Sequence, residues 1–494
     1  MMPTAPTELL NYVAGEWRRS TANERSPVVN PATGVTVAEV PHSVASEVDA
    51  VVRGAAAAFP AWRETPVVER VQPLYRLKAI LERDLDEIAR GLVEECGKTF
   101  GEAKGELQRG IENVEVACGM PSLMQGINNE DVARGIDEHM FRQPLGVVTA
   151  ITPFNFPGMI PLWFLPYAVA TGNCFVLKPS ERVPMTTQAI VRACEEAGFP
   201  AGVVSLVNGG RATVEALLDH DEVRAVSFVG STPVARAVYA RATANGKRAQ
   251  CQGGAKNPAI VLPDADMEMS TRILADSAFG CAGQRCLATS VAITVGEARE
   301  AFSERIADDA ATRRVGYGLE EGVQMGPVIS PESRDRIAGL VRTGVEEGAR
   351  VVVGGEPMSV DGYADGFFYH PTVVDGVMPG STLSGTEVFG PVLSLMHVET
   401  LEDAIALVND RPFGNQACVF TSSGASARAF RHQVRAGNVG INLGVAAPMA
   451  FFPFSGFKES FFGDLHAQGA HGVEFYTETK VVIERWPSTW SRRF

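Results

Sequence analysis

Cysteine and histidine are sparse in this sequence, and neither residue type is clustered. Eight cysteines are spread over 494 residues without a CxxC pair. This low density excludes a disulfide-based fold and favours a reducing compartment, the cytoplasm. The eight histidines are equally dispersed. We therefore expect neither a structural nor a catalytic metal, because both need several ligands close together.

Long apolar runs and basic clusters are also missing. The most apolar window, residues 159–170, is short and contains Pro161 and Pro166, so it does not suit a membrane span. Residues 1–20 lack the basic start and apolar stretch of a signal peptide. The net charge of −14 argues against nucleic acid or an anionic membrane as partner. We expect a cytoplasmic protein.

Short apolar runs that alternate with helical patterns predict an α/β fold. Residues 46–122 have apolar side chains at helical spacing. A second alternating set spans residues 257–450. We predict a Rossmann-type, doubly wound parallel sheet followed by a second α/β domain. The runs suited to buried parallel strands are Val147–Ile151, Cys174–Leu177, Val203–Val207 and Ala225–Val229.

Two polar segments lie outside these alternating sets. Residues 124–142 are polar and irregular, and residues 473–486 alternate like an exposed strand. Both could be arms that pair with another subunit. They could equally be an ordinary hairpin and a C-terminal strand.

The clearest chemical signal is the segment FGCAGQRC at residues 279–286. A helix is expected to end near Cys281, because Gly283 breaks it, and this leaves Cys286 in a loop beside Arg285. A neighbouring guanidinium favours the thiolate, which is the reactive form of cysteine. Taken alone, a cysteine beside an arginine is more often structural. Cys281 itself is expected to be a helix residue that faces the core.

Five further segments place that cysteine in a family pattern. They are PFNFP at 153–157, LKPSE at 177–181, FVGS at 228–231, GGAKNP at 253–258 and EVFGP at 387–391. Together with FGCAGQRC, in this order and over nearly the whole chain, they resemble the aldehyde dehydrogenase superfamily. The run from residue 153 to 184 is most similar to the CoA-acylating branch, the methylmalonate-semialdehyde dehydrogenases.

The resemblance implies a mechanism. Cys286 would attack an aldehyde carbonyl, hydride would pass to NAD, and a thioester would remain on the cysteine. Asn155 would donate its amide to the developing oxyanion, a contact worth roughly 3–4 kcal/mol. Read without the family, Asn155 would be the cap of a helix that follows Pro157.

The same resemblance implies a cofactor site for NAD. Lys178 and Glu181, at the end of a predicted strand, resemble the contacts to the adenosine ribose. A carboxylate there repels the 2′-phosphate of NADP, although Arg182 could offset part of its charge. Read without the family, Glu181 would be a first-turn helix carboxylate. The remaining positions that resemble cofactor contacts are Thr152, Phe154, Ser231, Gly253, Glu387 and Phe389.

The position of the general base departs from the hydrolytic members of the family. Where they have a glutamate, this chain has Gln252, and an amide cannot take a proton from water. A thiol needs less help, so coenzyme A (CoA) would be the acyl acceptor. Pro258 resembles the hydrolytic members instead, which keeps open a hydrolytic enzyme that uses another base.

Two arginines match those that the CoA-acylating branch uses for a substrate carboxylate. They are Arg109 and Arg285, and a guanidinium pair suits malonate semialdehyde or its methyl derivative. Decarboxylation and transfer to CoA would then give acetyl-CoA or propanoyl-CoA. Read without the family, Arg109 would form a helix-surface ion pair with Glu106 or Glu112. An inactive binding protein that kept this fold is a further alternative, against which the intact motifs argue.

The resemblance also implies a domain organisation. Residues 1–123 and 143–255 would form the NAD-binding domain, and residues 256–455 the catalytic domain. Residues 124–142 and 470–494 would form an oligomerisation arm. We therefore expect a homo-oligomer, a dimer or a tetramer.

Overall fold

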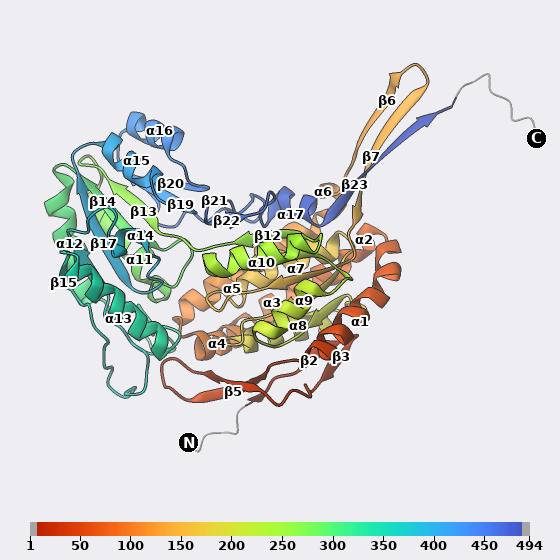
Figure 1. Ribbon diagram of the computed structural model, residues 1–494, viewed down its shortest axis with the longest axis horizontal. Coiled ribbons are helices and arrows are strands. Elements are labelled where there is room, and N and C mark those ends of the chain that lie inside the picture. The colour runs from red at the N-terminus through yellow and green to blue at the C-terminus, as the bar shows by residue number, and fades with distance from the viewer. Residues whose placement is uncertain (1–6, 487–494) are drawn as a thin grey trace, which may run out of the picture.

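The computed structural model describes residues 7–486 and shows two α/β lobes from which an arm of strands projects (Figure 1). The predicted α/β fold class is confirmed. The main sheet of the first lobe follows a non-sequential strand order. It comprises β22 (Phe461–Phe462), β12 (Arg248–Gln252), β11 (Val223–Val229), β8 (Val147–Ile151), β9 (Cys174–Lys178), β10 (Val204–Leu206), β2 (Asn11–Val13) and β3 (Glu16–Arg18).

The central strands β12, β11, β8, β9 and β10 are parallel. All residues of β8 and β9 are buried, as expected for parallel strands with both faces covered. Each of the four predicted strand runs overlaps one of these strands. The covering helices that alternate with them are α7 (Met159–Ala170), α8 (Pro184–Glu196), α9 (Arg211–Asp219) and α10 (Thr232–Ala244).

The apolar window at 159–170 is the core helix α7. Nearly all of its residues are buried, and a helix that is apolar all round belongs inside a protein or a membrane. Among the described residues, no helix has the length and apolarity needed to cross a bilayer.

The predicted helical stretch before the sheet consists of consecutive helices. They are α1 (Ala45–Glu64), α2 (Val67–Arg70), α3 (Gln72–Arg83), α4 (Leu85–Cys96), α5 (Phe100–Cys118) and α6 (Met120–Leu123). A capping box starts α5, in which Thr99 and Glu102 exchange side-chain and backbone hydrogen bonds. Near the N-terminus, a small separate sheet of β1 (Thr7–Glu8), β5 (Thr36–Pro41) and β4 (Arg25–Val29) lies at the foot of the molecule (Figure 1).

The second lobe has its own mostly parallel sheet. Its strands, in spatial order, are β15 (Arg350–Val353), β16 (Thr372–Asp375), β17 (Val392–Val398), β14 (Thr289–Val295), β13 (Asn257–Val261), β19 (Gln416–Phe420) and β20 (Asn438–Ile441). The accompanying helices are α11 (Met267–Phe279), α12 (Ala298–Thr312), α13 (Pro331–Glu346), α14 (Thr382–Gly385), α15 (Leu401–Asn409) and α16 (Gly424–Gln433). A short ribbon pairs β18 (Phe413–Gly414) with β21 (Phe457–Lys458). The chain passes between the two main sheets through residues 253–256.

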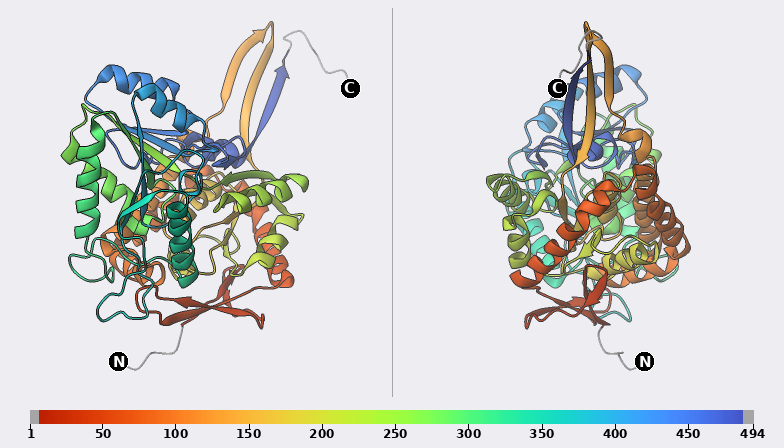
Figure 2. Two further views of the ribbon diagram at one scale, coloured as in Figure 1. Left: turned by 60° about the vertical axis from the view of Figure 1, so that its left-hand side comes forward. Right: turned by 90° about the vertical axis from the view of Figure 1, so that its right-hand side faces the viewer.

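The arm is a regular antiparallel sheet. It consists of β6 (Ile127–Ala133), β7 (Ile136–Pro144) and β23 (Thr477–Arg485), and it extends away from the lobes in both views of Figure 2. The segment at 124–142, for which a hairpin is one of the two interpretations left open, therefore forms a hairpin. The C-terminal strand begins later than predicted, because the chain first forms α17 (Gly469–Phe475), where Gly472 packs on the Tyr167 ring. Residues 487–494 of the predicted arm lie outside the described residues.

Candidate active site

The candidate site lies where parallel strands of the first lobe end. From β8 the chain moves through β9 to β10 on one side, and β11 and β12 lie on the other side. The carboxyl ends of β8 and β11 are thus a topological switch point, where open α/β sheets bind ligands. Thr152 follows β8, and its backbone N–H donates to the carbonyl of Lys178 at 3.1 Å.

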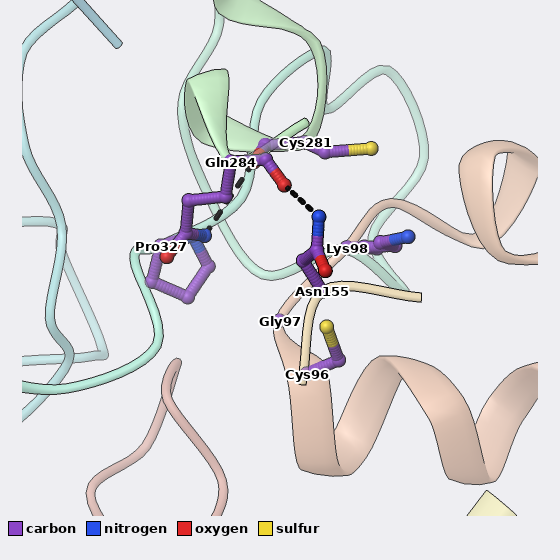
Figure 3. Close-up of a pocket in the computed structure, with 7 residues that line it drawn as sticks. All are labelled: Cys96, Gly97, Lys98, Asn155, Cys281, Gln284 and Pro327. Carbon is purple, nitrogen blue, oxygen red and sulfur yellow. Dashed lines mark hydrogen bonds between the residues drawn. The ribbon is translucent and has the colours of Figure 1, made fainter. Parts of the chain in front are cut away.

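Asn155 lies in the loop after β8 and does not cap a helix. Helix α7 begins only at Met159, with Gly158 as its cap residue. The buried Asn155 side chain instead donates from Nδ2 to the Gln284 carbonyl at 2.9 Å (Figure 3). Its amide therefore connects the β8 loop with the loop that carries Cys286.

The Cys286 loop has an unusual backbone. Helix α11 ends at Phe279, and a short 3-10 turn over Gly280–Gly283 follows. Cys281 is buried as predicted, but it lies beyond the helix end with φ +51°, a left-handed conformation. Gly283 also has positive φ, and a Cβ there would lie 2.0 Å from the Gly390 carbonyl oxygen. The loop turns back on itself because the 390 segment packs directly against it.

Two asparagines hold the backbone of Cys286. Its carbonyl oxygen accepts from Asn257 Nδ2 at 2.8 Å and from Asn415 Nδ2 at 2.9 Å. Burial, reinforced by the Glu387 carboxylate, raises the pKa of the thiol to about 12, while Arg285 opposes this only weakly. Arg285 thus favours the thiolate, but too weakly to offset the burial of the thiol.

The Arg285 guanidinium is held by the end of helix α11. Its Nη2 donates to the Ser277 carbonyl at 3.0 Å and also to the Asp276 carbonyl. A cation satisfies the exposed carbonyls of a helix C-terminus in this way. Nε of Arg285 is buried and has no acceptor among the described residues, so this donor remains available to a ligand.

Arg109, on α5, makes the ion pair that its helical spacing allows. Its Nη1 contacts Glu112, and its Nη2 donates to the Pro448 carbonyl. Both side chains are partly exposed. Glu106, the other predicted partner, pairs with Lys98 instead. The structure thus places Arg109 against the loop at 448–449, with its charge already paired.

A narrow pocket lies beside Asn155 (Figure 3). Its lining comes from the end of α4, the β8 loop and the Cys281–Gln284 turn. Lys98 and Asn155 both line the pocket (Figure 3). The lining residues are Cys96, Gly97, Lys98, Asn155, Cys281, Gln284 and Pro327.

The strand end of β9 carries a cation–carboxylate pair. Lys178 Nζ lies 3.3 Å from Glu181 Oε2, and the lysine side chain is 4 % exposed. Burial lowers the pKa of Lys178. Burial would raise the pKa of Glu181, but Lys178 and, more weakly, Arg182 lower it overall. Glu181 is therefore an ionised carboxylate at neutral pH.

The start of α10 and the turn at 253–255 are in direct contact. Ser231 is the cap residue of α10, and its side chain makes no capping hydrogen bond. Gly253 donates its N–H to the Ser460 carbonyl at 2.8 Å. Gly254 donates to Thr232 Oγ1 at 2.8 Å. Ser231 and Gly253 thus lie on adjoining segments.

Glu387 and Phe389 lie against the same turn. Glu387 Oε1 accepts from the Ala255 N–H at 3.0 Å. Burial raises the pKa of Glu387 to about 7. Phe389 has φ +48°, and its ring meets Phe154 edge to face at 5.7 Å. The structure therefore brings these residues, predicted from separate motifs, to one side of the Cys286 loop.

Gln252 ends β12 and is buried, with 5 % of its surface exposed. Its Nε2 donates to the Phe454 carbonyl at 3.2 Å, and its Oε1 has no donor among the described residues. No carboxylate therefore occupies this position, although a polar acceptor remains there. Over residues 7–486, we find no group of three or more histidine, cysteine or acidic side chains arranged to hold a metal ion.

Several residues that shape the site were not predicted as such. Asn415 and Asn257 hold the nucleophile loop, and Asn257 falls inside the GGAKNP motif, which gave a weak signal. Lys98, Glu102 and Glu106 lie in a helical stretch that the sequence showed only as helix. Lys256 is buried with no partner for Nζ among the described residues, and burial lowers its pKa to about 7.

Known proteins match this chain over almost its whole length. The model of the aldehyde dehydrogenase family matches residues 17–482. A malonate-semialdehyde dehydrogenase of Geobacillus kaustophilus is 47 % identical, over 98 % of this chain and 100 % of its own. A structure from Sinorhizobium meliloti, assigned as a methylmalonate-semialdehyde dehydrogenase and complexed with NAD, has a TM-score of 0.97. It is 40 % identical, over 98 % of this chain and 99 % of that one.

A second solved structure agrees. The methylmalonate-semialdehyde dehydrogenase of Oceanimonas doudoroffii has a TM-score of 0.96 at 44 % identity, and covers 98 % of this chain and 99 % of its own. The resemblance inferred from the motifs is thereby confirmed. The chain belongs to the aldehyde dehydrogenase family.

Proposed function

We propose that this protein oxidises malonate semialdehyde or its methyl derivative with NAD and passes the acyl group to CoA. One observation carries the proposal. In a chain whose relatives are named malonate-semialdehyde dehydrogenases, the place of the hydrolytic base holds the buried amide of Gln252. A site without that base suits an acyl acceptor that is itself a good nucleophile.

The chain's own residues supply the covalent steps. Cys286 Sγ releases its proton to solvent and bonds to the aldehyde carbon, and the carbonyl oxygen becomes an oxyanion. The Asn155 amide would donate to that oxyanion, with the Cys286 backbone N–H as second donor. Loss of hydride converts the adduct into a thioester on Cys286. The CoA thiol then takes the acyl group and returns the cysteine.

The residues at the switch point fit NAD, which supplies the hydride acceptor when it is bound. The ionised Glu181, supported by Lys178, would accept hydrogen bonds from the adenosine ribose. The start of α10 at Ser231 suits a pyrophosphate. Glu387 and Phe389 would hold the nicotinamide end. Contacts to the cofactor would also come from Thr152, Phe154, Arg182 and Gly253.

A carboxylated substrate needs a cationic partner near Cys286. Arg285 Nε is a buried donor with no acceptor within residues 7–486, and Arg109 borders the 448–449 loop. We propose that both bind the substrate carboxylate, Arg109 after loosening its ion pair with Glu112. The resulting thioester carries a carboxylate on the adjacent carbon. Loss of CO₂ before transfer then gives acetyl-CoA or propanoyl-CoA.

The wider organisation follows from the same proposal. Residues 1–123 and 143–255 would bind NAD, and residues 256–455 would carry the catalytic cysteine. The arm, residues 124–142 and 470–494, would join copies of the chain into a dimer or tetramer. Such an enzyme would work in the cytoplasm.

The direct test is NADH production from malonate semialdehyde and methylmalonate semialdehyde, with and without CoA, with the product identified by mass spectrometry. We expect turnover that depends on CoA and yields acetyl-CoA or propanoyl-CoA. Steady turnover to a free acid without CoA would contradict the proposal and favour a hydrolytic enzyme with another base. NAD binding without any NADH burst would favour an inactive binding protein.

A further inference from the structure

Helix α5 presents two carboxylates to two different loops of the site. Glu102 and Glu106 are one turn apart, so they lie on the same side of the helix. Glu106 is buried, with 4 % of its surface exposed. Neither residue is part of the reaction described above, and both accept hydrogen bonds from the backbone of residues close to Asn155 or Cys286.

Glu106 holds the loop that carries Asn155. Its Oε1 accepts from the N–H of Gly158 at 2.8 Å and of Met159 at 3.1 Å. These N–H groups begin α7, where a carboxylate also complements the helix dipole. The first of them is three residues beyond Asn155. The carboxylate therefore fixes where that loop ends.

Lys98 contacts both the Glu106 carboxylate and the loop that carries Asn155. Its Nζ pairs with Glu106 Oε2, and it lies 3.7 Å from the centroid of the Phe156 ring. Phe156 is the neighbour of Asn155. The ion pair thus contacts the loop at Phe156, Gly158 and Met159, directly after Asn155, and Lys98 also lines the pocket beside Asn155 (Figure 3).

Glu102 holds the nucleophile loop from the same helix. Its Oε1 accepts from the Cys281 N–H at 2.6 Å, where the backbone has turned left-handed. Three residues later, the Gln284 carbonyl accepts the Asn155 amide. One face of α5 is therefore connected to both loops, and the loops are connected to each other.

A buried ion pair usually adds little to the free energy of folding. Desolvation of two charges often exceeds their attraction, and apolar replacements can be as stable. We infer that Lys98, Glu106 and Glu102 are positioning residues, which set the Asn155 amide against the Cys286 loop. This inference rests on the proposed role of Asn155 as oxyanion donor. A purely structural pair would stabilise the fold without acting through Asn155.

A double-mutant cycle with Asn155 separates these two roles, because residues that act through one group are not additive. The variants are Glu106→Gln, Asn155→Ala and both together, with propanal and saturating NAD in a stopped-flow instrument. The readout is the rate of the first NADH turnover. Glu115→Gln on the exposed side of α5 is the matched control.

We expect Asn155→Ala to slow the first turnover by about 10²–10³-fold, the usual loss of one oxyanion donor. Glu106→Gln should slow it by about 10-fold or more, and only slightly further when Asn155 is already alanine. The KM for propanal and the NAD affinity should change little, and Glu115→Gln should equal the wild type. If Glu106→Gln does not fold, the half-buried Glu102→Ala enters the same cycle with the same expectation.

The inference would be overturned if Glu106→Gln slowed the first turnover by the same factor in the wild type and in Asn155→Ala. The carboxylates would then act independently of Asn155. An unchanged first turnover in both single glutamate variants would overturn it too. A wild-type protein without an NADH burst would contradict the proposed function instead. The two failures are therefore distinguishable.

Discussion

At the scale of single residues, the proposed function depends on Gln252, which we expect to determine whether CoA or water releases the acyl group. We predict that Gln252→Glu gains CoA-independent turnover, because a general base typically accelerates proton transfer by about 10²–10⁴-fold. Burial will raise the pKa of the new carboxyl and favour its action as a base near neutral pH. Release of free acid without CoA, followed by NADH formation, measures the gain. Gln252→Met removes the same amide without adding a base, so any gain there would contradict the explanation.

Arg109 tests how the substrate carboxylate is bound. We predict that Arg109→Ala raises the KM for malonate semialdehyde by about 10–100-fold, the cost of losing a charged hydrogen bond. Propanal has no carboxylate, so its KM should change little. Steady-state kinetics with both aldehydes make the comparison. Equal losses with both would mean that Arg109 only holds Glu112 and the 448–449 loop.

Glu387 should make NAD binding depend on pH. Its pKa is raised to about 7 by burial, so the carboxylate forms as the pH rises through that value. A carboxylate accepts hydrogen bonds from the ribose hydroxyls more strongly than a neutral carboxylic acid does. We therefore expect NAD to bind roughly fivefold more tightly at pH 8 than at pH 6. Calorimetry at both values measures this change. In Glu387→Gln the difference should vanish, and an unchanged pH dependence in that variant would assign it to another group.

The motifs predicted which residues lie together at the site, but not which hydrogen bonds their side chains form. Asn155, Glu387 and Phe389 were predicted because their short motifs resemble those of the family, in which each role needs a particular type of side chain. The direction of Arg285 was not predictable, since neighbours in sequence do not show that the free carbonyls of α11 are within its reach. The same holds for Glu102 and Glu106, whose partners lie far away along the chain.

At the scale of elements, the Cys286 loop depends on Gly283. We predict that Gly283→Ala destabilises the protein by more than the roughly 1–2 kcal/mol of a left-handed backbone, because its Cβ would displace the Gly390 carbonyl. Thermal unfolding and the first-turnover rate should both fall. Gly376→Ala shares the positive φ but would meet nothing within 4 Å. Equal effects of the two variants would contradict the importance of the close contact.

Elements whose apolar pattern is buried on both faces were predictable. The strand run Val147–Ile151 coincides with β8. The arm hairpin was only one of two equal interpretations of its segment, because every residue of β6 is exposed and its polar pattern carries no periodicity. Left-handed residues such as Cys281 were missed for a related reason. Only the contact with a distant segment imposes that conformation, and cysteine has no preference for it.

At the scale of the whole molecule, the arm leaves large apolar side chains uncovered. Val481 and Ile483 of β23 are 61 % and 66 % exposed, which is unusual for a monomer and typical of a contact surface. We predict that Val481→Lys with Ile483→Lys yields a smaller species in analytical ultracentrifugation. Val68→Lys changes a similarly exposed residue on α2 and should leave the assembly intact. Unchanged mass in the double variant would exclude this face of the arm as the contact.

The central claim is that the acyl group rests on Cys286 until CoA removes it, and intact-protein mass spectrometry tests this most directly. The protein is mixed with NAD and malonate semialdehyde without CoA, quenched, and measured before and after CoA is added. We predict an acyl adduct that maps to Cys286, is absent in Cys286→Ala, persists in water and disappears on addition of CoA. An adduct that water removes as fast as it forms, or none at all during NADH production, would contradict the account.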